Sequence, residues 1–141
     1  MIAYVDASVV LRVALGQPDA LPEWRRIARG VSSVLILTES LRTLDRLRLR
    51  AKLADDDVAH RRAKILELIA TLELVEIDAV VLDRAAQPMP TELGTLDAIH
   101  LATALLWRDE ERVELTMATH DRPLGLGARA HGLPVVGLAR A

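Results

Sequence analysis

Short apolar runs along the chain alternate with longer segments in which apolar residues recur every three or four positions. Four of the runs have the length and composition of buried strands: residues 2–5, 74–77, 115–118 and 134–138. Val31 and Ser32 are predicted to form extended chain at most. Strands that alternate with helices in this order predict an α/β fold with a mostly parallel sheet.

The segments with helical spacing lie between these runs. Residues 7–15 form the first, and a glycine and a proline end it. A short helix is expected from about Pro22 to Arg29, with proline in its first turn. Further helices are predicted at residues 55–72, 79–85, 96–108 and 124–130, with Asp78 and Thr95 as the caps of the second and third.

Residues 34–37 are ambiguous, because four consecutive apolar residues also suit a buried strand. We favour a helix, since Ser33 is a good N-cap and apolar positions continue at helical spacing as far as Leu44. In that helix Glu39 lies on the same stripe as Arg42.

The composition narrows the classes to which the chain can belong. Its 141 residues suit one domain, placed at residues 1–141, and its core must be aliphatic because there is no Phe. The absence of Cys excludes disulfides, zinc–thiolate sites and cysteine nucleophiles. Neither a secretion signal nor a run of 18 apolar residues is visible, so a soluble cytoplasmic protein without membrane contact is expected.

The charge is small overall and uneven locally. A formal net charge of −2 argues against binding nucleic acid by bulk attraction alone. Between Arg42 and Lys64, however, the sequence contains eight basic residues and only four aspartates. Arginine's planar fork suits phosphate and carboxylate partners. A solvated, salt-bridged surface explains the same stretch equally well, and both interpretations stay open.

Four acidic residues stand where side chains can converge on one pocket of an α/β sheet. Asp6 ends the first strand, and Asp121 lies three residues beyond the strand at 115–118. Asp97 and Glu39 lie in the first and second turns of their helices. Several carboxylate oxygens are what Mg²⁺ or Mn²⁺ requires, and such an ion can activate water for phosphodiester hydrolysis.

Each acid also has a plain structural explanation. Asp97 suits a helix N-terminus, Asp121 can cap the last helix, and Asp6 can bind turn backbone after a strand. Glu39 can pair with Arg42 one turn on. The prediction of a site therefore depends on the four acids in combination.

The combination resembles the motifs of PIN-domain nucleases. The matching segments, in order, are Tyr4-Val5-Asp6-Ala7-Ser8, Thr38-Glu39-Ser40-Leu41-Arg42, Gly94-Thr95-Leu96-Asp97-Ala98-Ile99-His100 and Thr119-His120-Asp121-Arg122. Order, spacing and length are similar to a stand-alone PIN domain of the bacterial VapC toxin type, over essentially the whole chain. The resemblance implies a three-layer α/β/α fold.

The resemblance also implies a function. Asp6, Glu39, Asp97 and Asp121 would bind one or two Mg²⁺ or Mn²⁺ ions, and a water activated there would cleave RNA to a 5′-phosphate and a 3′-hydroxyl. The hydroxyls of Ser8 and Thr119 would orient these groups, while a cognate VapB-type antitoxin would inhibit a homodimer. The basic stretch from Arg42 to Lys64 would then contact RNA or antitoxin.

Other interpretations carry less weight. A haloacid-dehalogenase-type phosphohydrolase needs a second acid two residues after Asp6, where Ser8 stands, and is rejected. A non-catalytic interaction module with the same fold, acting through a protein or RNA partner, is the alternative that remains. His100 falls one turn after Asp97, and a packed helix histidine is favoured over a site residue. Trp24 and Trp107 are expected in the core or a dimer interface.

Overall fold

A computed structural model of the chain describes residues 1–139 and places five parallel strands in one sheet. The strand order is β3-β2-β1-β4-β5, so that β1 is central. The strands are β1 (Ile2–Val5), β2 (Arg29–Ser33), β3 (Glu73–Val75), β4 (Thr116–Ala118) and β5 (Val135–Val136).

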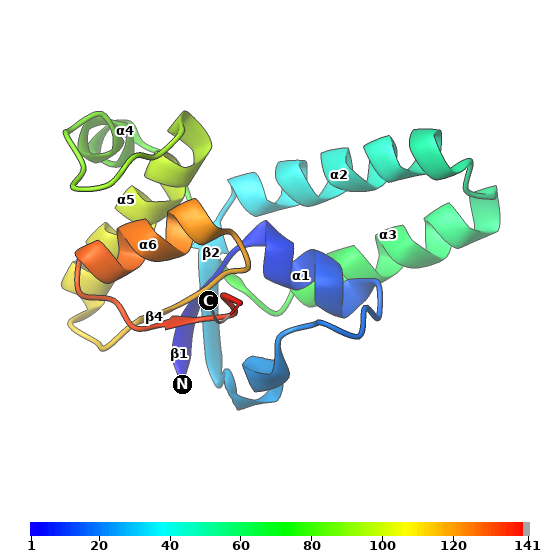
Figure 1. Cartoon of the computed structure of the whole chain (residues 1–141), viewed down its shortest axis with the longest axis horizontal. Helices are drawn as coiled ribbons and strands as arrows, with labels where there is room; N and C mark the ends of the chain where they lie inside the picture. Colours follow the sequence, from blue (N-terminus) through cyan, green and yellow to red (C-terminus); the bar gives the residue numbers. More distant parts are fainter. Residues whose placement is uncertain (140–141) are drawn as a thin grey trace.

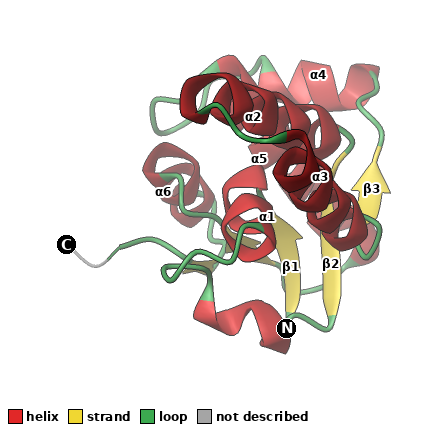
Figure 2. Ribbon diagram, turned by 90° about the vertical axis from the view of Figure 1, so that its right-hand side faces the viewer, coloured by secondary structure: helices red, strands yellow, loops and turns green. Residues whose placement is uncertain are grey.

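Helices connect successive strands and cover both faces of the sheet, which makes the three-layer α/β/α arrangement. Among them, α2 and α3 form a long hairpin that projects beyond the sheet (Figure 1). Figure 2 looks along this hairpin and shows its two helices side by side. The helices are α1 (Ala7–Ala14), α2 (Leu35–Ala51), α3 (Asp55–Ile69), α4 (Ala79–Ala85), α5 (Thr95–Glu111) and α6 (Arg122–Ala130), with a short 3-10 helix at Pro22–Arg26.

The central strand separates two hydrophobic cores because its side chains alternate between the faces. Ala3 and Val5 belong to the core formed with α1, α2 and α3. Tyr4 points to the opposite face, into the core formed with α5 and α6, where Trp107 is also buried. Both faces of β1 are therefore buried. Its carboxyl end lies next to the loops and helix starts that carry the acids.

The expectation of mere extended chain at Val31 and Ser32 is wrong. These residues lie in β2, which pairs with β1 on one side and β3 on the other. The strand has few apolar residues, so its hydropathy does not reveal it. Its two serines, Ser32 and Ser33, are fully buried, and Ser32 Oγ donates a hydrogen bond to the carbonyl oxygen of Val5 at 2.7 Å.

The helix favoured at residues 34–37 is confirmed, although its first residue is Leu35 and its cap residue is Val34. Ser33 still contributes, because its Oγ accepts a hydrogen bond from the backbone N–H of Leu35 at 3.1 Å. The prediction of Thr95 as a cap is wrong; Thr95 is the first residue of α5, and Gly94 precedes it.

No helix within residues 1–139 combines the length and the apolar character needed to cross a membrane.

Candidate active site

All four predicted acids line one cavity of about 450 Å³ at the carboxyl ends of the central strands. Asp6 follows β1 directly, and Asp121 follows β4 and precedes α6. Glu39 comes from α2 and Asp97 from the first turn of α5. The side chains thus come together from four separate segments, as the resemblance implied.

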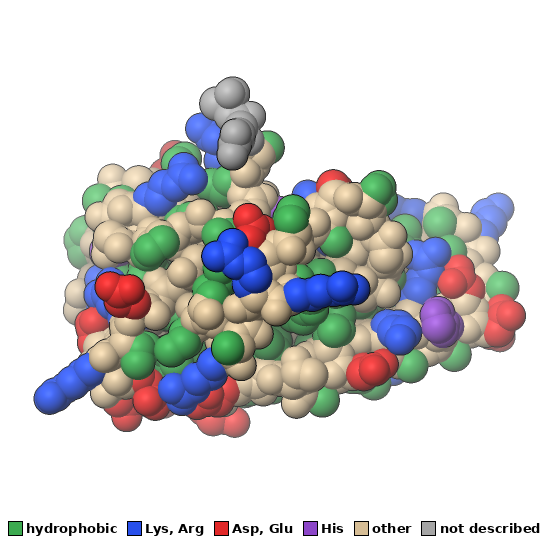
Figure 3. Space-filling model, turned by 90° about the horizontal axis from the view of Figure 1, so that it is seen from below, with side chains coloured by type: hydrophobic (Ala, Val, Ile, Leu, Met, Phe, Trp, Pro, Cys, Tyr) green, Lys and Arg blue, Asp and Glu red, His purple; other side chains and the backbone are tan. Residues whose placement is uncertain are grey.

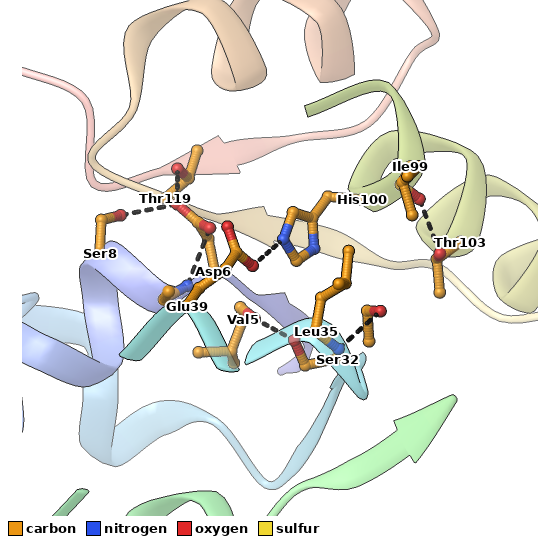
Figure 4. A network of polar contacts seen from close by, with 12 residues as sticks. Val5, Asp6, Ser8, Ser32, Leu35, Glu39, Ile99, His100, Thr103 and Thr119 are labelled. Atoms are coloured by element: carbon orange, nitrogen blue, oxygen red, sulfur yellow. Dashed lines mark hydrogen bonds and ion pairs between the residues drawn. The ribbon is translucent and has the colours of Figure 1, made fainter. Parts of the chain in front are cut away.

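Asp6 is the acid held most completely by the protein. Its Oδ1 accepts a hydrogen bond from the backbone N–H of Ala7, and its Oδ2 accepts from both Ser8 Oγ and Thr119 Oγ1, each at 2.8 Å. The side chain is only 7% exposed. Figure 4 shows Ser8 and Thr119 flanking this carboxylate. The two hydroxyls expected beside the acids therefore both contact Asp6.

The same two hydroxyls connect Asp6 to the loop after β4. Ser8 Oγ accepts a hydrogen bond from the backbone N–H of His120, and Thr119 Oγ1 accepts from that of Asp121, both at 3.0 Å. Asp121 in turn caps α6, because its Oδ1 accepts from the backbone N–H of Leu124 at 3.1 Å. The capping explanation for Asp121 is therefore correct, and it leaves the other carboxylate oxygen, Oδ2, for the cavity.

Glu39 is held by a histidine rather than by Arg42. Its Oε1 lies 2.5 Å from His100 Nε2, while Arg42 pairs with Asp45 at 3.1 Å. His100 is 1% exposed, so it is the buried helix residue that was favoured, and it also contacts a site acid. No local sequence pattern reveals this pair, because the two residues are 61 positions apart.

Tyr4 continues the contact on the far side of His100. Its Oη lies 2.6 Å from His100 Nδ1 and accepts a hydrogen bond from the backbone N–H of Ser33 at 3.2 Å. Burial raises the pKa of Tyr4 far above its usual value, so the hydroxyl keeps its proton. With that proton directed at Nδ1, the neutral ring carries its own on Nε2 and donates it to Glu39.

The position of Asp97 in the cavity raises the pKa of its carboxyl group. Burial, then the charges of Asp121 and Asp6 and finally that of Glu39, raise its pKa from 3.8 to about 6, against an opposing effect of His100. For His100, burial lowers the pKa, but the hydrogen bond and charge of Glu39 outweigh it, so that the pKa lies above 6.5. Burial first, and repulsion from the neighbouring acids second, therefore make the ionised form of Asp97 costly in the cavity.

The residues fit a hard divalent cation by their chemistry. Every acid offers carboxylate oxygen. After burial, repulsion from the other acids raises the pKa of Asp97, and a divalent cation would relieve that repulsion. Within residues 1–139, no three acidic or histidine side chains are already gathered closely enough to hold an ion. At Asp6, Glu39 and Asp121, a protein donor already binds one carboxylate oxygen.

Comparisons with known proteins agree with the motifs. Residues 3–122 match the family described as PIN domain. The chain is 36% identical over 137 residues to "Ribonuclease VapC46" of Mycobacterium tuberculosis (strain ATCC 25618 / H37Rv), covering 94% of this chain and 95% of that protein.

Two solved structures share the fold at 18% identity. PAE2754 from Pyrobaculum aerophilum superposes with a TM-score of 0.65, over 96% of this chain and 83% of the other. A toxin–antitoxin complex from Klebsiella pneumoniae gives 0.64, over 98% and 96%.

Proposed function

The chain belongs to the PIN-domain family, and from this premise we propose that it is a metal-dependent endoribonuclease, the toxin of a VapC-type toxin–antitoxin pair. One observation carries the proposal: four carboxylates from distant segments line one cavity. The resemblance to a relative named as a ribonuclease, over nearly the full length of both chains, supports RNA as the substrate.

Asp6, Glu39, Asp97 and Asp121 would hold Mg²⁺ or Mn²⁺. When bound, such an ion lowers the pKa of a water and offsets the negative charge of a phosphoryl group. The protein's part is to position the acids. Ser8 and Thr119 fix Asp6, and the N-terminus of α6 fixes Asp121. Burial and the neighbouring acids raise the pKa of Asp97, so its charge is costly without a cation.

The partners follow from the same assignment. We assign the chain a cognate antitoxin of the VapB type and a homodimeric state in the cytoplasm. The fold likeness to a chain of a structure described as a toxin–antitoxin complex supports the antitoxin partner. An antitoxin that blocks the acidic cavity would switch cleavage off.

Cleavage of single-stranded RNA by protein freed from any partner tests the proposal. With Mg²⁺ or Mn²⁺ the wild type should cleave, and EDTA should stop it. Asp6→Asn and Asp97→Asn should each abolish cleavage with the fold intact by circular dichroism, because each removes a charge that the cation needs. Asp83→Asn, an exposed change on α4, is the matched control.

The opposite outcomes are equally distinct. Cleavage that persists in EDTA would refute the metal-dependent reaction. Near-wild-type activity in Asp6→Asn or Asp97→Asn would remove that residue from the mechanism. A wild type that binds RNA or a protein tightly and never cleaves would support the non-catalytic module.

A further inference from the structure

A second cavity of about 440 Å³ adjoins the acidic one and shares Ser8, Leu11, Thr43 and Arg46 with it. It lies between α1 and the carboxyl-terminal half of α2, and it is lined by basic, small polar and leucine side chains. We call it the arginine groove. Its lining residues are Ser8, Leu11, Arg12, Leu15, Gln17, Thr43, Arg46, Leu47 and Arg50.

The charge of the arginine groove is the reverse of that of the acidic cavity. Three guanidinium groups line it, from Arg12, Arg46 and Arg50, and its described lining includes no carboxylate. Arg12 is already paired with Asp19 at 2.9 Å. Arg46 donates to Thr43 Oγ1 at 3.1 Å, and within residues 1–139 neither Arg46 nor Arg50 forms an ion pair.

Four other basic residues of the 42–64 stretch are paired with acids. Arg42 and Arg48 both pair with Asp45, on the same helix. On α3, Arg61 pairs with Asp57, and Lys64 lies 3.6 Å from a carboxylate oxygen of Glu67. The salt-bridged explanation of the stretch therefore holds for these residues. Arg46 and Arg50 stand apart, because they line the arginine groove and keep their charge available.

The direction of the arginine groove is set by α2. Glu39, Thr43, Arg46 and Arg50 follow at steps of four, three and four residues, so they share one face of the helix. At 1.5 Å per residue, Arg46 and Arg50 lie about 10 and about 16 Å from Glu39 along the axis. One row of side chains on α2 thus runs from the acidic cavity into the arginine groove.

We propose that the arginine groove binds backbone phosphates of the RNA strand beside the phosphate to be cleaved, with Arg46 and Arg50 as the contacts. This inference rests on the proposed nuclease function and deepens it. Guanidinium groups match phosphate oxygens in charge and geometry. They also offset the repulsion that an anionic strand meets at four carboxylates.

The overall charge of the chain does not replace the arginine groove as a source of affinity for RNA. The net charge is −2, so bulk attraction to RNA is absent. On the face shown in Figure 3, basic and acidic side chains are interspersed rather than gathered by sign. Affinity for a polyanion must therefore come from local features such as the arginine groove.

Binding of a short single-stranded RNA, measured by fluorescence anisotropy in EDTA across a range of NaCl concentrations, tests the arginine groove without cleavage. For single strands, the slope of log K against log salt changes by about 0.7 for each phosphate that the protein no longer neutralises. Arg46→Gln and Arg50→Gln should each make this negative slope shallower by about 0.7. Together they should weaken binding on the order of tenfold at low salt. Arg26→Gln, an exposed change on the 3-10 helix, is the matched control.

Cleavage kinetics give a second readout. The double variant should raise KM for RNA with little change in kcat, since its arginines bind phosphates that do not react. A salt slope equal to that of the wild type in the double variant would overturn the proposal. So would a double variant that loses affinity for antitoxin but not for RNA, since the groove would then be a protein-binding surface.

The two proposals fail in distinguishable ways. If the wild type cleaves RNA and the salt slope does not respond to the arginines, only the arginine groove is refuted. If the slope responds but no cleavage occurs with Mg²⁺ or Mn²⁺, the arginine groove stands as an RNA-binding site and the nuclease proposal fails.

Discussion

Asp97 and Asp6 are both carboxylates in one cavity, yet their surroundings differ. Asp6 accepts three hydrogen bonds from donors that stabilise its charge. The pKa of Asp97 is instead raised to about 6 by burial and by the charges of Asp121, Asp6 and Glu39. The raised pKa of Asp97 makes the stability of the metal-free protein depend on pH.

Asp97→Asn should stabilise the metal-free protein above pH 6. Between pH 4 and pH 6 the folded state holds a proton on Asp97 that the unfolded chain has released, so stability falls as pH rises through this window. Above it the ionised carboxylate weakens the fold by on the order of 1 kcal/mol, after allowance for solvent screening. Urea unfolding in EDTA at pH 7.5 and 4.5 should show a clearly larger gain at the higher pH. An equal gain at both would contradict the pKa of Asp97.

His100 should act on the site through Glu39. Loss of its Nε2–H frees the carboxylate of Glu39 from a fixed position, and such a loss typically weakens metal affinity by about 10- to 100-fold. We therefore expect weaker Mn²⁺ binding by calorimetry in His100→Leu. His100→Gln places a donor near the same point and should recover part of the affinity. Binding equal to the wild type in His100→Leu would show that His100 is only a packing residue.

At the scale of elements, α6 and the site share one side chain. Asp121 caps the helix through Oδ1 and borders the cavity. The preceding loop is held by Thr119, whose hydroxyl joins Asp6 to the backbone of Asp121. Asp121 therefore serves both the start of α6 and the site, and substitutions can separate the two roles.

Asp121→Asn and Asp121→Ala should differ in stability but not in activity. Asparagine caps a helix about as well as aspartate, whereas alanine costs about 1 kcal/mol. Both remove the charge, so cleavage should fall in both variants. Thermal and urea unfolding should place Asp121→Asn near the wild type and Asp121→Ala below it. Equal stability of the two variants would show that the capping hydrogen bond contributes little to the fold.

At the scale of the whole molecule, binding of a cation and stability of the fold are linked. The acids lie on segments that only the folded chain brings together, so an ion that binds them binds the native state selectively. The repulsion on Asp97 is part of the cost of folding without a cation.

Mg²⁺ and Mn²⁺ should therefore raise the melting temperature in a concentration-dependent way. The rise should be larger at pH 7.5 than at pH 5, because a proton on Asp97 competes with the cation below about pH 6. Differential scanning fluorimetry can measure both, with NaCl of equal ionic strength as the control. A rise that NaCl reproduces, or that Asp6→Asn retains, would show that the acids do not bind the ion.

Local patterns predicted the elements whose own residues show their burial. The apolar run of β1, the helical repeat of α2 and the turn residues between elements all act over a few positions, so one sequence suffices to find them. β2 was not predicted because its own residues are mostly not apolar. Its burial comes from the strands that pair with it on both sides. The α/β class was predictable because the other strands and the helices do show such local patterns, in alternating order.

The sequence by itself determined which residues could form the site: four acids at strand ends and helix starts, and the hydroxyls of Ser8 and Thr119. Only the tertiary structure decided their partners. It paired Glu39 with His100 rather than Arg42 and placed Tyr4 behind that histidine. It also placed Arg46 and Arg50 in the arginine groove, whose described lining includes no acid. The physical reason is distance along the chain: Tyr4 and His100 are 96 positions apart, and only packing across the sheet brings them together.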